Sequence, residues 1–159
     1  MQSVSVLCVG KLKEKFYADA CAEYQKRLGR FCRLNVVELP EQRLPDDPSP
    51  AEIAAALERE ADDIEEKLPR GAVIALCVEG RALSSEQLSD TLARYASQGT
   101  SQLTFLIGGS FGLAERVKAR ADLRLSMSPM TFPHHLARVM LLEQIYRAYQ
   151  IRSGSKYHK

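Results

Sequence analysis

The sequence lacks any stretch that approaches the roughly 20 consecutive apolar residues of a membrane-spanning helix. Its opening residues, MQSVSVLCVGKLKEK, hold an apolar run shorter than a signal peptide needs, and charged residues follow at once. Internal repeats and low-complexity segments are also absent. These absences argue against a membrane protein, and we expect a cytoplasmic protein with no membrane partner.

Metal-binding and redox patterns are also missing. The four cysteines, Cys8, Cys21, Cys32 and Cys77, form no CxxC pair, and the three histidines are not spaced as zinc ligands. Cys8 and Cys77 lie inside apolar runs, which favours buried thiols that act as small hydrophobic side chains. We expect no metal site. A chain of 159 residues is long enough to fold without disulfides, as one domain over residues 1–159.

The net charge is only +2, which by itself indicates nothing about nucleic acid, but the charges are unevenly distributed. Residues 38–66 contain eleven acidic and two basic side chains, whereas residues 11–33 contain seven basic and three acidic ones. No acidic residue follows Glu143, and Arg147, Arg152, Lys156 and Lys159 do. A polyanion would therefore be attracted to the two ends of the chain and repelled by its middle.

Short apolar runs alternate with helical patterns along the chain. Strands are predicted at Ser3–Val9, Leu34–Leu39, Ala72–Val78, Leu103–Ile107 and Leu123–Ser126. A capping box at Ser49–Glu52, a cap at Ser84 and a proline at Pro133 indicate where three of the intervening helices begin. The last helix is expected to be lined by Leu136, Val139, Met140, Glu143 and Tyr146. The order βαβαβαβαβα predicts an α/β fold, a mostly parallel sheet with helices on both faces.

In such sheets ligands bind beyond the carboxyl ends of the strands. The candidate site is therefore formed by Leu76–Gly80, Gly108–Leu113 and Met127–Pro133. The turn IGGSFGL at Ile107–Leu113 is either a tight strand-to-helix turn or a place where a ligand approaches the backbone closely. It matches neither GxGxxG nor the P-loop, so dinucleotide and nucleoside-triphosphate binding are disfavoured.

The segment SMSPMTFPHH at Ser126–His135 contains two prolines, which prevent a regular helix or strand through it. Its apolar residues suit either a stiff wall for an adenine ring or thioether, or a packed connector. His134 is more simply explained as a capping or supporting residue, and Arg138, one turn later, as an ion-pair arginine. The tail from Arg152 to Lys159 mixes cations with an aromatic residue, which fits either RNA contacts or a frayed terminus.

Several segments together resemble one family in order and spacing. This family is the ribosomal RNA large subunit methyltransferase H family of the SPOUT class, whose bacterial members methylate N3 of a pseudouridine in the helix 69 hairpin of 23S rRNA. The segments that carry the resemblance are Val9–Lys13 (VGKLK), Gly108–Gly112 (GGSFG), Ser126–His134 (SMSPMTFPH), Arg138-Val139, Glu143–Ala148 (EQIYRA) and Tyr157–Lys159 (YHK).

The resemblance implies a SPOUT fold with a C-terminal trefoil knot, a homodimer, and S-adenosylmethionine as cofactor. The residues expected to contact the cofactor are Leu76, Gly108, Met127, Ser128, Pro129, Met130, Thr131 and Phe132. Phe111 and Pro129 depart from the pattern of the family, in which polar residues are common at the first position and more variable ones at the second. Side-chain contacts to RNA from these two positions are therefore in doubt.

Methylation of N3 requires the loss of its imide proton, so a general base is expected. His158 is the candidate because histidines titrate near neutral pH. Tyr157 and Arg138 are candidates for positioning the base and contacting phosphate. The small basic surface suggests that 23S rRNA is recognised within the assembled ribosome. Two alternatives remain: a SPOUT methyltransferase acting on tRNA, and a cofactor-binding ribosome-associated factor without catalysis.

Overall fold

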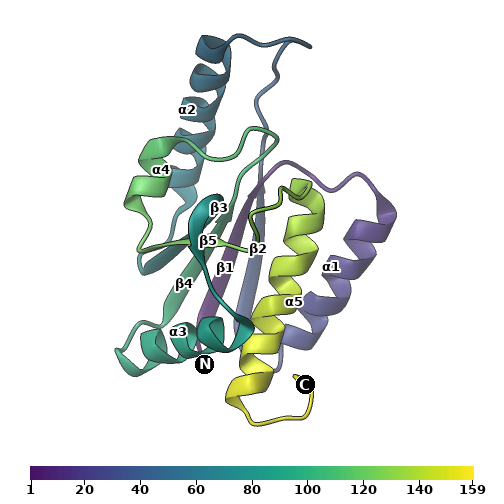
Figure 1. Cartoon of the computed structure of the whole chain (residues 1–159), viewed down its shortest axis with the longest axis vertical. Coiled ribbons are helices and arrows are strands. Elements are labelled where there is room, and N and C mark those ends of the chain that lie inside the picture. Colours follow the sequence, from purple (N-terminus) through teal and green to yellow (C-terminus); the bar gives the residue numbers. More distant parts are fainter.

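The computed structural model describes all residues from 1 to 159 and contains ten elements in the predicted order (Figure 1). They are β1 (Ser3–Val9), α1 (Lys15–Leu28), β2 (Arg33–Leu39), α2 (Pro50–Lys67), β3 (Ala72–Ala82), α3 (Ser85–Ser97), β4 (Gln102–Ile107), α4 (Glu115–Arg120), β5 (Leu123–Ser126) and α5 (His134–Arg152). The largest difference from the prediction is that β3 continues to Ala82, with an irregularity between Leu76 and Arg81 where it pairs with β5.

The five strands form one sheet in the order β2-β1-β4-β3-β5, and every pair is parallel. The α/β class expected from the sequence is confirmed. Because β4, β3 and β5 are neighbours, the segments that follow them lie at one edge of the sheet. The trefoil knot stays a prediction from the family resemblance.

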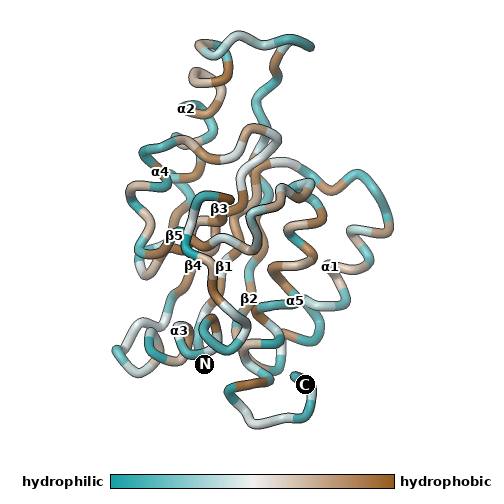
Figure 2. Tube along the Cα trace, viewed as in Figure 1, coloured by the Kyte–Doolittle hydropathy of each residue, from teal (hydrophilic) through white to brown (hydrophobic).

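Helices cover both faces of the sheet (Figure 1). One face packs against α1, α3 and α5, in a core centred on Phe105 and Ile74. The other face packs against α2 and α4, around Leu106 and Val117. The strands at the centre of Figure 2 are mostly brown, and the loop before α2 is mostly teal, as burial of apolar side chains requires. No helix of the structure has the length and apolarity that crossing a membrane requires.

Local signals explain where two helices begin. The hydroxyl of Ser49 accepts a hydrogen bond from the N–H of Glu52 at 3.1 Å, and the Glu52 carboxylate accepts one from the N–H of Ser49 at 3.1 Å. Ser84 and Gln87 form the same reciprocal pair at the start of α3. Both predicted capping residues are therefore confirmed, and each satisfies N–H groups that the helix itself leaves unpaired.

The predicted lining of α5 was only partly right. The five residues expected to line it are half-buried, and of these Val139 and Tyr146 pack against the core. The buried side chains of α5 are instead Arg138, Leu141, Leu142, Ile145, Ala148 and Tyr149. Apolar residues lie all round this helix because it packs between α1 and α3 and also covers the sheet, so the spacing of its apolar residues did not single out one face.

Candidate active site

The three predicted strand ends converge on one cavity of about 770 Å³. Leu76 from β3 and the turn Gly108–Leu113 after β4 form two of its walls, and the segment between β5 and α5 forms a third. Of the eight predicted cofactor residues, seven line this cavity: Leu76, Gly108, Met127, Ser128, Met130, Thr131 and Phe132. Pro129 does not line it and is exposed.

The glycine turn after β4 is closely packed against itself. A Cβ on Gly108 would overlap the backbone of Gly112, and Gly112 has a φ of +80°, which favours glycine. The N–H of Gly112 donates to the carbonyl of Gly109 at 3.1 Å. Glycine is thus needed at Gly108 for the turn to close. The structure confirms the tight turn that the sequence offered as one interpretation, and the same turn lines the cavity; close approach of a ligand to its backbone stays a prediction.

The loop Met127–Pro133 is held by its own serines. Ser126 donates its hydroxyl hydrogen to the carbonyl of Ser128 at 3.1 Å, and the hydroxyl of Ser128 accepts from the N–H of Met130 at 2.9 Å. The Met130 side chain is left 73% exposed, which is unusual for a large apolar residue. The loop therefore presents an apolar surface to the cavity on a backbone with little freedom.

Two cavity residues of opposite charge were not singled out from the sequence. Lys118 of α4 forms an ion pair with Glu79 of β3 at 2.5 Å, and the Lys118 side chain is only 17% exposed. The hydrogen bond from Lys118 holds the pKa of Glu79 below its ordinary value, so this carboxylate stays charged. Glu79 lies in the predicted strand end, but no local pattern indicates that a lysine 39 positions later reaches it.

Arg138 is buried, and two of its guanidinium nitrogens have partners within the protein. Its side chain is 3% exposed, with one nitrogen 2.7 Å from the Glu38 carboxylate and another donating to the carbonyl of Gly10 at 3.0 Å. Burial alone would raise the pKa of Glu38, but hydrogen bonds from Arg138 and from the N–H of Leu12 outweigh burial and lower it. In this arrangement Arg138 anchors the loop after β1 and does not face solvent or the cavity.

The C-terminal tail folds back onto α5 and α3. Tyr157 donates its hydroxyl hydrogen to Glu143 at 3.2 Å, and its ring lies under the guanidinium of Arg147. Burial and the Glu143 carboxylate raise the pKa of Tyr157, which keeps the phenol protonated. His158 lies 3.1 Å from Arg147 through Nδ1 and 2.6 Å from Glu86 through Nε2. Since arginine can only donate, Nδ1 is the acceptor and neither ring nitrogen is free.

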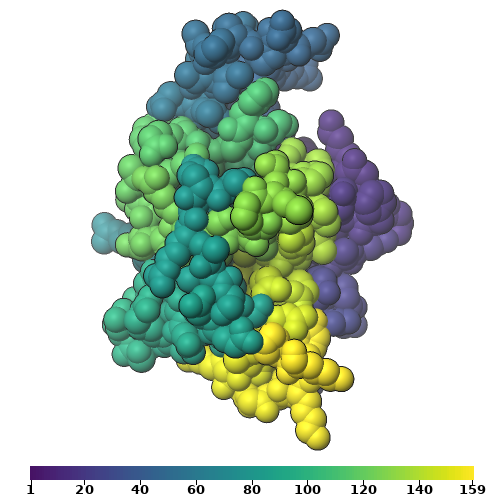
Figure 3. Space-filling view, in the orientation of Figure 1, coloured from purple at the N-terminus to yellow at the C-terminus, as the bar shows by residue number.

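The docked tail is separated from the cavity. Of the α5 residues that the tail contacts, Glu143 is the nearest to the start of the helix. The last α5 residue that lines the cavity is Ala137. These residues are six positions apart, or about 9 Å along a helix. Figure 3 shows the yellow C-terminal residues at the lower end of the view, away from the light-green segment before α5. The structure therefore does not bring His158 and Tyr157 to the predicted cofactor site of the same chain.

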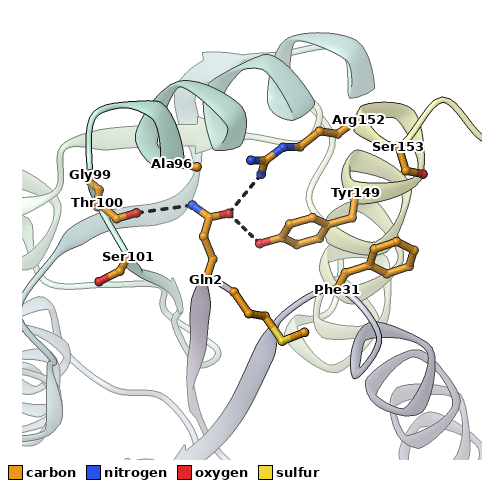
Figure 4. A pocket seen from close by; sticks show the side chains of 10 residues that line it. Gln2, Phe31, Ala96, Gly99, Thr100, Ser101, Tyr149, Arg152 and Ser153 are labelled. Atoms are coloured by element: carbon orange, nitrogen blue, oxygen red, sulfur yellow. Dashed lines mark hydrogen bonds between the residues drawn. The ribbon is translucent and has the colours of Figure 1, made fainter.

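A second cavity, of about 580 Å³, lies at the opposite edge of the sheet (Figure 4). There the Gln2 amide oxygen accepts from Tyr149 at 2.9 Å and from Arg152 at 3.4 Å. Arg152 is its only lining residue with a charged side chain, and the ends of α1, α3 and α5 surround it. Helix C-termini carry partial negative charge, which disfavours an anion. This cavity contains no residue of the three predicted segments, all of which line the cavity of about 770 Å³.

Comparison with known proteins identifies the family. A model described as "Predicted SPOUT methyltransferase" matches residues 2–158. "Ribosomal RNA large subunit methyltransferase H" of Streptococcus equi subsp. zooepidemicus (strain MGCS10565) is 48% identical over 157 residues, which are 98% of this chain and 99% of that protein. The protein of the same name from Clostridioides difficile (strain 630) is 45% identical over 158 residues, 99% of each chain.

The chain belongs to the ribosomal RNA large subunit methyltransferase H family. Its fold is that of the SPOUT methyltransferases. A tRNA (m1G37) methyltransferase from Aquifex aeolicus matches over 92% of this chain and 70% of its own, with a TM-score of 0.56 and 13% identity. A probable methylase family protein from Haemophilus influenzae Rd KW20 matches over 98% and 68%, with a TM-score of 0.54 and 11% identity. At these identities the likeness concerns the fold alone.

S-adenosylmethionine is the cofactor of this methyltransferase class, and the cavity fits it. About 770 Å³ is within the range of small-ligand pockets, whose walls are mostly apolar with a few polar groups. Apolar side chains such as Leu76, Met127 and Phe132 suit the adenine ring and thioether portion. Backbone groups of the glycine turn can hydrogen-bond to it without an intervening side chain. When bound, the cofactor supplies an electrophilic methyl group on a sulfonium.

Proposed function

We propose that this chain transfers a methyl group from S-adenosylmethionine to N3 of a pseudouridine in the helix 69 hairpin of 23S rRNA. One observation carries the proposal. In a chain related over nearly its whole length to ribosomal RNA large subunit methyltransferase H proteins, two of the segments that resemble that family, Gly108–Gly112 and Ser126–His134, meet at one cavity at the carboxyl edge of the sheet. As the substrate is ribosomal, we also propose a cytoplasmic location.

The reaction is an in-line displacement. Leu76, Gly108 and Met127 would hold S-adenosylmethionine, which would supply its methyl group to N3 and be left as a neutral thioether. The imide proton of N3 must pass to a base for nitrogen to supply its electron pair. The protein holds the two reactants in line and excludes water, which lowers the entropic part of the barrier. We assign proton removal to His158 and alignment of the base to Tyr157.

In the docked tail His158 has no free nitrogen, and it lies beyond reach of the cavity in its own chain. We therefore propose that the enzyme is a homodimer and that the tail of one subunit, once released from Glu86 and Arg147, completes the cavity of the other. Leu136, Val139 and Met140 of α5 are only half-buried and offer apolar surface for such an interface. Release would free Nδ1 of His158 to accept the proton.

Arg138 receives a different role. Because it is buried and bonded to Glu38 and Gly10, we propose that it positions the loop after β1 and does not contact phosphate itself. The tail carries Lys156 and Lys159, which form no ion pair, and these are better placed to contact RNA. With a net charge of only +2, affinity for naked RNA is expected to be low, and recognition of the assembled ribosome is proposed.

The test is methyl transfer from labelled cofactor to four acceptors: assembled ribosomes, free large subunits, naked 23S rRNA and bulk tRNA. Label is expected in 23S rRNA when ribosomes are supplied, and mass mapping should place it on one pseudouridine of helix 69. Label in tRNA alone would favour the tRNA alternative. Cofactor binding without label in any acceptor would favour the non-catalytic factor.

A further inference from the structure

The carboxylate of Glu41 lies where three loops of the carboxyl edge meet. Glu41 follows Pro40 at the end of β2, the outermost strand, and reaches past β1 to the glycine turn after β4. Its Oε1 accepts a hydrogen bond from the backbone N–H of Ser110 at 2.9 Å. The bond joins residues 69 positions apart and is the only hydrogen bond between a side chain and an N–H of this turn. Glu41 itself does not line the cavity.

Two glycines leave room for this carboxylate. A Cβ on Gly109 would lie 2.7 Å from Oε1 of Glu41, closer than real Cβ atoms come. A Cβ on Gly10, in the loop after β1, would lie 3.3 Å from Oε2 of Glu41 and 3.5 Å from Nε2 of His134. The loops after β1 and β4 thus both lack side chains where Glu41 passes, and His134 at the start of α5 is next to the same point.

His134 has an unused hydrogen-bonding atom facing Glu41. Its Nε2 is buried and has no hydrogen-bond partner, and Oε2 of Glu41 is 3.9 Å away. Buried polar nitrogen atoms without a partner are rare and costly. A movement of about 1 Å would bring these atoms to the usual hydrogen-bond distance of about 2.9 Å. Unlike Glu41, His134 lines the cavity, as does Ser110.

We propose that Glu41 is a positioning residue for the cofactor: it ties the glycine turn at Ser110 to the start of α5 at His134 and so sets the spacing of two cavity walls. This proposal rests on the cavity being the cofactor site. A carboxylate bond to a backbone N–H is charge-assisted and stronger than a neutral one. Loss of the tie lets the turn move relative to α5, and the cofactor must then restore their spacing when it binds.

Calorimetric titration with S-adenosylmethionine tests the proposal in the full-length protein. Glu41→Ala removes both contacts and should weaken cofactor affinity about ten-fold, the scale of one charge-assisted hydrogen bond. Glu41→Gln keeps a neutral acceptor for Ser110 and should lose less, and Glu41→Asp should be weakened because its shorter side chain cannot span both partners. Asp47→Asn, in the same loop and exposed, is the control for a change in charge and should bind normally.

A second readout does not depend on the cofactor. Burial, followed by the nearby charges of His135 and Arg138, lowers the pKa of His134, while the carboxylates of Glu41 and Glu14 act in the opposite direction. Glu41→Gln should therefore lower the pKa of His134 further, as measured by NMR titration of its ring proton. Hydrogen exchange at the Ser110 amide should accelerate in Glu41→Ala.

The outcomes separate this proposal from the function it rests on. If the wild-type protein does not bind S-adenosylmethionine, the cofactor site itself is wrong, whatever the variants do. If the wild type binds and Glu41→Ala binds equally well, or Asp47→Asn is weakened as much, the positioning role is refuted. An unchanged pKa of His134 in Glu41→Gln would refute the part that involves α5. If Glu41→Ala does not fold, the NMR and binding results for Glu41→Gln decide.

Discussion

Some residues at the carboxyl edge of the sheet are restricted by packing against their neighbours and also line the cavity. Gly108 is the plainest case, since its hydrogen faces the backbone of Gly112. A side chain there is excluded by the protein itself, before any ligand is considered. Any loss of cofactor binding on substitution of Gly108 would therefore have a cause within the turn.

Gly108→Ala should abolish measurable binding of S-adenosylmethionine because its methyl group forces the turn open. Gly99→Ala is the matched control: Gly99 also lies in a turn, with a φ of +83°, but nothing is within 4 Å of its Cβ position. Backbone strain in Gly99→Ala should lower the free energy of unfolding by about 1 kcal/mol, and this variant should bind the cofactor normally. Calorimetry and thermal unfolding measure the two effects. Normal affinity in Gly108→Ala would contradict the packing described for this turn.

The ion pair between buried Arg138 and partly exposed Glu38 gives a second prediction. Glu38→Gln leaves the Arg138 charge buried without a carboxylate and should destabilise the protein by about 2–3 kcal/mol at neutral pH. This is below the ~3–5 kcal/mol of fully buried pairs because the Glu38 side chain is 36% exposed. Urea unfolding at fixed protein concentration measures the difference.

The same comparison has a defined pH dependence. Because the pKa of Glu38 is lowered by folding, its contribution is complete above the ordinary carboxyl pKa of about 4.3 and is lost as pH falls through the lowered value. The stability difference between wild type and Glu38→Gln should therefore shrink below about pH 4. A difference that stays constant down to pH 3 would show that the pair does not contribute through charge.

Among the elements, the tail and α5 depend on each other most clearly. The sequence suggested an irregular, polar tail, and the structure shows it docked through Glu86, Glu143 and Arg147. These contacts are partly exposed, so each contributes little stability and the tail can exchange between docked and released states. Such weak docking is consistent with the proposal that His158 acts as a base only after the tail is released.

Deleting Tyr157–Lys159 should leave thermal stability and cofactor affinity nearly unchanged, because the tail is separate from both the core and the cavity. Single-turnover methylation of ribosomes should fall at least about 100-fold, the scale for loss of a general base or positioning contact. His158→Ala should lose nearly as much if His158 is the base, and raising the pH should then restore part of the rate. Equal rates for truncated and intact protein would show that the tail has no catalytic role.

For the whole molecule, the separation of tail and cavity makes the oligomeric state part of the mechanism. We expect a two-fold homodimer, and light scattering at micromolar concentration should give twice the mass of the 17.8 kDa chain. A monomer under these conditions would remove the proposed source of the base.

Mixed dimers test whether the tail acts across the interface. Neither Gly108→Val nor the tail deletion should be active alone. In a heterodimer, the truncated subunit keeps an intact cavity and the Gly108→Val subunit keeps an intact tail, so one complete site forms. Equimolar mixing with full subunit exchange should restore about a quarter of wild-type activity, since half of the dimers carry one of two sites. Tails that act within their own chain would give no recovery.

The sequence alone determined the α/β class, the order of the ten elements and the three segments that form the cavity. Apolar runs, capping boxes and glycine turns each depend on residues that are close in the sequence, so the elements they form can be predicted from short segments. The same holds for the residues of the cavity, because the carboxyl ends of parallel strands meet at one edge whichever strands are neighbours. Membership of the family followed from motifs that keep their order along the chain.

Only the tertiary structure decided which partner each charged side chain has. Arg138 was a candidate for phosphate contact until its burial against Glu38, 100 positions earlier, was known. Lys118, Glu41 and the docked His158 are likewise paired with residues far away in sequence. The buried face of α5 was missed because this helix is apolar all round. Such pairings follow from the strand order β2-β1-β4-β3-β5, and no pattern within a few residues encodes that order.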